Sequence, residues 1–163
     1  MADEVLERIR DALSQAGVDF REIAHAPTHT SEESARVRGE SLSVGAKALL
    51  LKTDDSFRLF VLPADRQLDT KKIKQQLKVK STRFATSEEL LELTGLVPGS
   101  VPPFGTPILP FELYGDTAIG VVEDKVAFNV GSLTLSIVMK ASDWKAVAKP
   151  IQFSFAKAPA DER

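Results

Sequence analysis

Cysteine is absent from this 163-residue chain. Its absence excludes disulfides, thiolate nucleophiles and thiolate metal ligands, and it makes a reducing, intracellular setting the simpler expectation. Histidine is scarce, because the chain contains only His25 and His29. Their spacing of four fits a helical metal pair, but Pro27 lies between them and no third ligand is evident. We therefore expect no metal site.

The sequence also lacks long apolar runs and a strong charge of either sign. No apolar stretch approaches membrane-spanning length, and the first residues do not follow the basic-then-apolar pattern of a signal peptide. The formal net charge is -2 at pH 7, so no global cationic field favours nucleic acid or a membrane surface. We expect a cytoplasmic protein without a membrane partner, in which any nucleic-acid binding is local.

Motifs for nucleotide or redox chemistry are missing as well. There is no glycine-rich phosphate loop, dinucleotide fingerprint or kinase motif, and no cofactor is expected. Length and a 43% hydrophobic content fit one compact domain, residues 1–163. Within it, residues 1–23 should form an N-terminal helix and lead-in, and the small, polar tail 156–163 should fray.

Hydrophobic periodicity and capping residues predict interleaved helices and strands. The expected helices are 5–16, 31–38, a segment after Asp69 that carries Ile73 and Leu77, the segment between Thr86 and Gly95, and a short helix from Ser142. The expected strands are 20–24, 44–51, 57–62, 118–122, 126–130 and 133–139. This order indicates an α/β or α+β domain with a mixed, curled sheet.

One lysine stands out because it lies inside an apolar strand. Lys47 is within the run Val-Gly-Ala-Lys-Ala-Leu-Leu-Leu, residues 44–51, which reads as a strand covered on both faces. A buried ammonium normally finds a partner, loses its proton or faces a cleft where an anionic ligand completes it. A lysine that reaches water along its own stem is an equally ordinary explanation.

Two glycine-containing segments could form a pocket near this lysine. The loop Gly99-Ser100-Val101-Pro102-Pro103-Phe104-Gly105 combines rigid prolines with glycines that allow close approach to the backbone. It reads either as a rigid surface turn or as a wall whose amides bind a substrate oxygen. Gly131-Ser132 interrupts an apolar stretch, where a bulge or a ligand contact is typical. Neither histidine forms a recognisable serine-hydrolase pattern with Ser132.

The segment 66–83 is strongly basic in a chain that is otherwise slightly acidic. It carries seven basic residues against Asp69 alone, which gives a local net charge near +6. Such a segment is either a solvated helix face or a phosphate-binding stripe. If it binds nucleic acid, the candidates are Lys71, Lys72, Lys74 and Lys78.

Four motifs in order resemble the YbaK/ProX family, which comprises free-standing aminoacyl-tRNA deacylases and the editing domain inserted in bacterial prolyl-tRNA synthetases. The resemblance spans roughly residues 24–144. The motifs are Gly-Ala-Lys-Ala-Leu-Leu-Leu at 45–51, Leu-Asp-Thr-Lys-Lys at 68–72, Thr94-Gly95 followed by the loop 99–105, and Phe-Asn-Val-Gly-Ser at 128–132. The resemblance implies a barrel-like, curled mixed sheet of about seven strands with helices packed outside.

The resemblance also implies which residues act. The lysine that matches Lys47 is essential for hydrolysis in this family, and the glycine that matches Gly131 shapes the pocket wall. Alanine-specific editing domains place a histidine near Ser132, so this serine points to another small amino acid. We assign Lys47, Gly131 and Ser132 to catalysis. The expected substrate-binding residues are Thr30, Gly99, Ser100, Val101, Pro102 and Pro103.

The expected reaction is hydrolysis of the ester between a small, wrong amino acid and tRNA, with tRNA(Pro) the leading candidate by resemblance. The attacking group would be a water or a substrate hydroxyl, positioned in a small pocket. Lys47 would anchor a phosphate or the ester, and amides of the Gly99 and Gly131 loops would stabilise the oxyanion. Misacylated tRNA is the expected partner, with a synthetase as a second one. The alternative is an inactive module of the same fold that binds tRNA or a synthetase.

Overall fold

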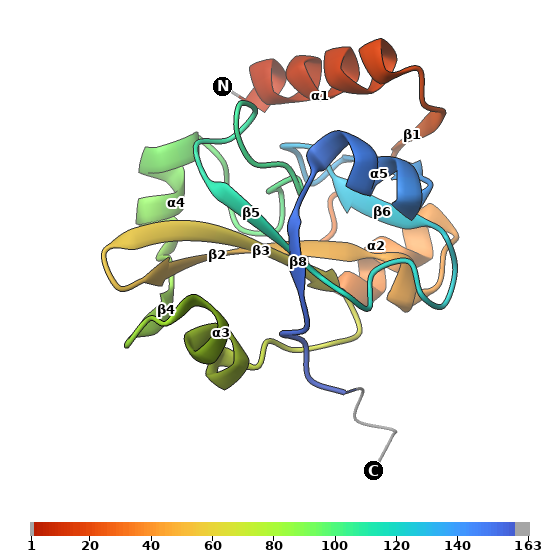
Figure 1. Cartoon of the computed structure of the whole chain (residues 1–163). Coiled ribbons are helices and arrows are strands. Elements are labelled where there is room, and N and C mark those ends of the chain that lie inside the picture. The colour runs from red at the N-terminus through yellow and green to blue at the C-terminus, as the bar shows by residue number, and fades with distance from the viewer. Residues whose placement is uncertain (1, 159–163) are drawn as a thin grey trace.

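The computed structural model describes residues 2–158 and contains helices and strands that alternate along the chain (Figure 1). Within that range there are five α-helices, one 3-10 turn and eight strands. The helices are α1 (Ala2–Ala16), α2 (Ser31–Arg38), α3 (Thr70–Leu77), α4 (Ser87–Thr94) and α5 (Ala141–Ala148), and the 3-10 turn is η1 (Leu42–Val44). The strands are β1 (Phe20–Ala24), β2 (Ala46–Thr53), β3 (Ser56–Pro63), β4 (Thr82–Phe84), β5 (Glu112–Asp116), β6 (Val126–Asn129), β7 (Leu135–Met139) and β8 (Ile151–Phe153).

Capping residues fix the helix ends where the sequence predicted them. The side chain of Thr30 accepts a hydrogen bond from the Glu33 backbone N–H at 3.1 Å, and α2 begins at the next residue. Thr86 and Glu89 form a reciprocal capping box at the start of α4. Gly95 follows α4 with φ 75°, a left-handed conformation that glycine adopts without steric cost. These boundaries are confirmed.

The strands form two sheets, which corrects the expected single, curled, barrel-like sheet of about seven strands. One sheet is antiparallel with the order β1-β7-β6, and the other is mixed with the order β4-β2-β3-β5-β8. The sheets stay separate because β7 pairs with β1 and β6, and within residues 2–158 the two sheets are joined only by an isolated bridge from Gly45 to Ala127. The α/β class and the mixed character of the larger sheet are confirmed.

The segment 118–122 is a turn, so the strand predicted there is wrong. Asp116 accepts a hydrogen bond from the Ala118 N–H at 2.8 Å, which closes a turn of the kind that aspartate favours. Val121 and Val122 are then 73% and 80% exposed. The actual strand, β5, lies just upstream and runs parallel to β3 and β8. It escaped prediction because Gly115 and Asp116 are residue types depleted in strands.

Two apolar clusters cover the two faces of the five-stranded sheet. Figure 1 shows α1 above this sheet and α3 below it. Ile9 and Leu13 of α1 pack with Leu59 of β3 in the larger cluster. Ile73 of α3 packs with Phe60 of β3 in the smaller one. Alternate side chains of β3 therefore enter opposite clusters, as the period of two in a strand requires.

The end of the described chain is better anchored than the sequence predicted. Phe155 and Ala156 are 0% and 5% exposed, and both backbone N–H groups donate to the buried Asp116 carboxylate at 2.7 and 2.8 Å. Fraying from residue 156 is thus wrong at its first position, because a buried carboxylate accepts bonds from this segment. Residues 159–163 of the predicted tail lie outside the described residues.

Candidate functional site

The free edge of β2 borders a pocket of about 250 Å³, which we call the first pocket. Strand β4 pairs only with Leu51–Thr53 and the bridge to β6 involves Gly45, so within residues 2–158 no strand pairs with Lys47–Leu50 on that edge. The other walls come from residues 28–38 around the start of α2, from the loop after α4 and from Asn129 at the end of β6. Of the predicted site residues, Thr30, Lys47, Gly99 and Val101 line this pocket.

Lys47 lines the first pocket and is half-buried. Its ammonium has no ion pair and no hydrogen bond with any residue in the described range 2–158. Burial lowers the pKa of Lys47 from its usual value, whereas the more distant carboxylates of Asp65 and Glu32 raise it. The lysine is therefore a cation without a partner among the described residues, which is the state that an anionic ligand would complete.

Arg38, the last residue of α2, is a second cation in the first pocket. Burial lowers its pKa to about 10, so the guanidinium stays charged at neutral pH. Its Nε donates to Ser136 Oγ at 2.9 Å and its Nη2 donates to Asn129 Oδ1 at 3.1 Å. Both acceptors are neutral, and no carboxylate of the described chain forms a salt bridge with Arg38.

A polar network holds Arg38 against the loop that follows α4. Asn129 accepts from Arg38 and from the Ser136 hydroxyl at 3.0 Å, and its amide donates to the Gly99 carbonyl at 2.8 Å. His25 Nε2 lies 2.8 Å from Ser136 Oγ. Because Asn129 and Ser136 are 8% and 0% exposed, the network is a rigid buried support for the guanidinium.

Two residues of the Gly99 loop, Gly99 and Val101, line the first pocket and have backbone N–H groups without a partner among residues 2–158. Gly99 has φ 86°, a conformation that favours glycine. Among the described residues, the N–H groups of Gly99 and Val101 have no hydrogen-bond acceptor. Ser100, Pro102 and Pro103, also predicted to bind substrate, are buried behind the wall instead, and Trp144 Nε1 donates to the Pro103 carbonyl at 2.9 Å. They fix the shape of the loop from within.

Gly131 and Ser132 lie outside the lining of the first pocket. The Gly131 N–H donates to the Ser100 carbonyl at 2.8 Å, so this N–H is not free to stabilise an oxyanion, and the role expected for amides of the Gly131 loop stays a prediction. Gly131, with φ 87°, instead ties β6 to the Gly99 loop. Ser132 Oγ bonds with Thr134 in a local turn. A catalytic role for either residue stays a prediction.

Hydroxyl groups form part of the lining of the first pocket. Thr28 and Ser34 are 3% and 8% exposed, both line the first pocket, and their hydroxyl oxygens lie 2.8 Å apart. One of the two hydroxyl protons makes that bond, and the other has no acceptor among the hydrogen bonds of residues 2–158. A polar group inside the pocket can therefore bond with this pair.

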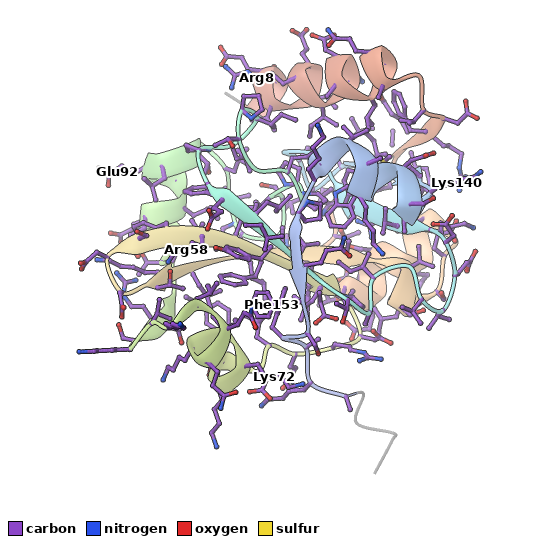
Figure 2. The ribbon with its side chains drawn as sticks, in the orientation of Figure 1. Arg8, Arg58, Lys72, Glu92, Lys140 and Phe153 are labelled. Atoms are coloured by element: carbon purple, nitrogen blue, oxygen red, sulfur yellow. The ribbon has the colours of Figure 1, made fainter. Side chains whose placement is uncertain are left out.

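The predicted tRNA-binding lysines lie on and just after α3. Lys71, Lys72, Lys74 and Lys78 are all exposed, and none forms a salt bridge in the part of the chain that the structure describes. Figure 2 shows Lys72 on the lower side of the molecule, by α3. The lysines are thus free to contact phosphates.

Sequence reasoning missed Arg38, Asn129, Ser136, Thr28 and Ser34. An arginine in the last turn of a helix normally interacts with the helix dipole, so Arg38 gave no signal. Ser136 did give one, because it is a hydroxyl inside the apolar run Leu-Ser-Ile-Val-Met at 135–139. A buried serine of this kind requires a polar partner.

Comparison with known proteins identifies the family. Residues 25–147 match the aminoacyl-tRNA editing domain. The chain belongs to the aminoacyl-tRNA editing domain family. As a member of this family it is an aminoacyl-tRNA deacylase, a hydrolase whose substrate is aminoacyl-tRNA. The matched range contains the whole first pocket.

Individual editing-domain relatives agree with this assignment. The chain is 34% identical over 154 residues to the multifunctional Ser/Thr-tRNA deacylase ProXp-y of Escherichia coli K12, with 91% of each chain covered. It is 33% identical over 118 residues to the proline–tRNA ligase of Bacillus licheniformis, of which it covers 20%. A solved structure of a proposed trans-editing enzyme for prolyl tRNA synthetase has a TM-score of 0.76 and 23% identity, covering 94% of this chain and 98% of that one. This last match concerns the fold.

The described residues contain neither a membrane-spanning helix nor a cluster of metal ligands. No helix among residues 2–158 is both long and apolar enough to cross a membrane. In the same range, no group of three or more histidine or carboxylate side chains is placed to hold a metal ion.

Proposed function

We propose that this deacylase acts in trans on tRNA that carries serine or threonine. The observation that carries the proposal is the pairing of two uncompensated cations, Lys47 and Arg38, with a hydroxyl-lined wall in one small pocket. The cations suit the phosphate and ester end of the substrate, and the hydroxyls suit the amino-acid side chain. The Ser/Thr specificity printed for the E. coli relative supports the same choice.

Several residues of the first pocket have proposed roles in ester hydrolysis. Lys47 and Arg38 bind the terminal phosphate or ester, and the free N–H groups of Gly99 and Val101 stabilise the charge that develops on the ester carbonyl. The attacking group is a water or a neighbouring substrate hydroxyl, and the pocket holds it close to the carbonyl. Thr30 borders the space that the amino acid occupies.

Hydroxyl recognition predicts a preference within a panel of misacylated tRNAs. Seryl- and threonyl-tRNA should be hydrolysed about 10- to 100-fold faster than alanyl-tRNA, because alanine leaves the Thr28–Ser34 pair without its ligand partner. Relative kcat/KM values for the seryl, threonyl, alanyl and cysteinyl forms measure this preference.

The variant Ser34→Ala should narrow the preference by lowering the rate for seryl-tRNA and sparing that for alanyl-tRNA. If alanyl-tRNA is the best substrate of the unaltered protein, the proposed amino-acid specificity is wrong. If no member of the panel is hydrolysed, deacylation itself is not the activity.

The tRNA and its delivery are part of the proposal. Similarity to segments of proline–tRNA ligases favours tRNA(Pro), and a synthetase that hands over the misacylated product is the candidate protein partner. Because such tRNA is made in the cytoplasm, we place the protein there. The whole chain, residues 1–163, acts as one editing domain.

The lysines of α3 should contribute to tRNA affinity through phosphates. The double variant Lys72→Glu and Lys74→Glu should raise the KM for charged tRNA and flatten the dependence of log KM on log salt by about one to two units of slope. Enzyme kinetics from 50 to 300 mM salt measure both effects. Glu88→Lys and Glu92→Lys on α4 provide a charge-reversal control elsewhere on the surface. An unchanged slope would place α3 outside the tRNA interface.

A further inference from the structure

A second pocket of about 170 Å³ adjoins the first. The two share five lining residues, Ala48, Leu49, Pro98, Gly99 and Val101, so they form one continuous groove along the free edge of β2. None of the residues that line the second pocket is charged, whereas the first pocket contains Lys47 and Arg38. The groove thus has a cationic end and a neutral, mostly apolar end.

Phe84 gives the neutral end a planar surface. It is the only aromatic residue among those that line the second pocket, and it is 58% exposed. A large exposed aromatic side chain beside a reactive pocket is a typical platform for an unpaired nucleobase. The volume suits one planar ring system, because a cavity of ~150 Å³ accepts benzene.

The backbone of β2 supplies hydrogen-bonding groups at the junction of the pockets. The Leu50 carbonyl accepts from the Ala85 N–H at 2.9 Å, so Leu50 directs its backbone groups toward the free edge. Residues two apart in an antiparallel strand direct these groups the same way, so Ala48 does so as well. Strand β4 stops before it reaches Ala48, and within residues 2–158 no other segment bonds with its N–H or carbonyl.

We propose that the second pocket binds the adenine of the 3′-terminal adenosine of tRNA. Phe84 stacks on the base, and the N–H and carbonyl of Ala48 pair with its Watson–Crick edge, which offers one acceptor and one amino donor. The ester is attached to the ribose of this same nucleoside, so the base must lie one sugar away from the reacting carbonyl. Two adjoining pockets meet that requirement. The inference rests on the proposed function, hydrolysis of seryl- or threonyl-tRNA in the first pocket.

A double-mutant cycle that combines changes at Phe84 with changes to the terminal base tests whether the ring stacks on the base. Acceptor-stem RNAs are charged with serine by an aminoacylating ribozyme, with either adenosine or an abasic ribose at the 3′ end. On the adenosine substrate, Phe84→Ala should lower kcat/KM on the order of 5- to 100-fold. On the abasic substrate, kcat/KM of the unaltered protein should already be low, and Phe84→Ala should lower it by less than a further twofold. Replacing the terminal adenine with purine removes the amino group and should lower kcat/KM of the unaltered protein about fivefold or more.

Controls separate stacking from other causes. Phe84→Tyr keeps a planar ring and should recover most of the kcat/KM that Phe84→Ala loses, whereas Phe84→Leu should behave like Phe84→Ala. Leu91→Ala removes an apolar side chain that is 54% exposed on α4 and lines neither pocket, and it should change nothing.

Three outcomes would overturn the adenine site. In the first, Phe84→Ala lowers kcat/KM equally on the adenosine and the abasic RNA. In the second, Phe84→Ala lowers kcat/KM on neither RNA. In the third, the unaltered protein is fully active on the abasic RNA. In each of these cases the unaltered protein still hydrolyses seryl-RNA, so the proposed function survives. If the unaltered protein hydrolyses no charged RNA at all, the proposed function fails and the adenine site fails with it.

Discussion

Lys47→Ala should lower kcat/KM for deacylation on the order of 100- to 1000-fold, the range typical for loss of one charged or hydrogen-bonding group that stabilises a transition state. The structure gives the reason, because this ammonium lines the first pocket and no described carboxylate pairs with it. Its positive charge is therefore available to the substrate. Single-turnover hydrolysis of seryl-tRNA, corrected for spontaneous ester hydrolysis, measures the loss.

The fold should tolerate this substitution. Removing a half-buried cation that has no partner takes away a desolvation cost, so the unfolding midpoint should stay within a few degrees of the original. Lys52→Ala is the matched control, since Lys52 lies on the same strand but outside both pockets, with its Nζ 5.9 Å from the Phe57 ring centroid. It should keep activity within twofold. Near-normal activity of Lys47→Ala would remove the lysine from the mechanism.

The contrast between Lys47 and Arg38 explains how far sequence alone could predict the site. Lys47 was detectable because a charge inside an apolar strand conflicts with its surroundings. Arg38 ends a polar helix, where arginine is ordinary, and only the fold brings it against Asn129 and Ser136, which lie 91 and 98 residues later in the sequence. A local sequence pattern reveals a residue that does not suit its neighbours in the sequence. A site assembled from distant segments produces no such pattern in any one segment.

The same distinction applies to the fold. Helices α2 and α4 have capping residues that act within four positions, so their limits were predictable. Strand β5 is defined by parallel pairing with β3, whose paired residues lie 54 positions earlier, and with β8, whose paired residues lie 37 positions later. Its Gly115 and Asp116 oppose a strand by propensity, and tertiary packing overrides them. The division into two sheets likewise depends on the long-range pairing of β1 with β7.

Arg38→Ala should lower kcat/KM about 100-fold, with KM for the charged tRNA raised. The guanidinium is charged, lines the pocket and is aligned by hydrogen bonds to two buried neutral groups. Arg38→Lys keeps the charge but cannot reproduce two bonds in a fixed planar geometry, so it should recover only part of the activity.

A second effect distinguishes Arg38 from a merely structural residue. Its side chain aligns Asn129, whose amide donates to the Gly99 carbonyl, so the arginine couples one wall of the first pocket to the other. Asn129→Asp would put a carboxylate beside the guanidinium, offset the charge of Arg38 and remove the amide donor to the Gly99 carbonyl, and it should impair deacylation as strongly as Arg38→Ala while leaving the protein folded. Arg36→Ala, an exposed arginine of the same helix, should have no effect. Full activity of Asn129→Asp would mean that the pocket needs no free charge at Arg38, and Lys47 alone would then serve the substrate anion.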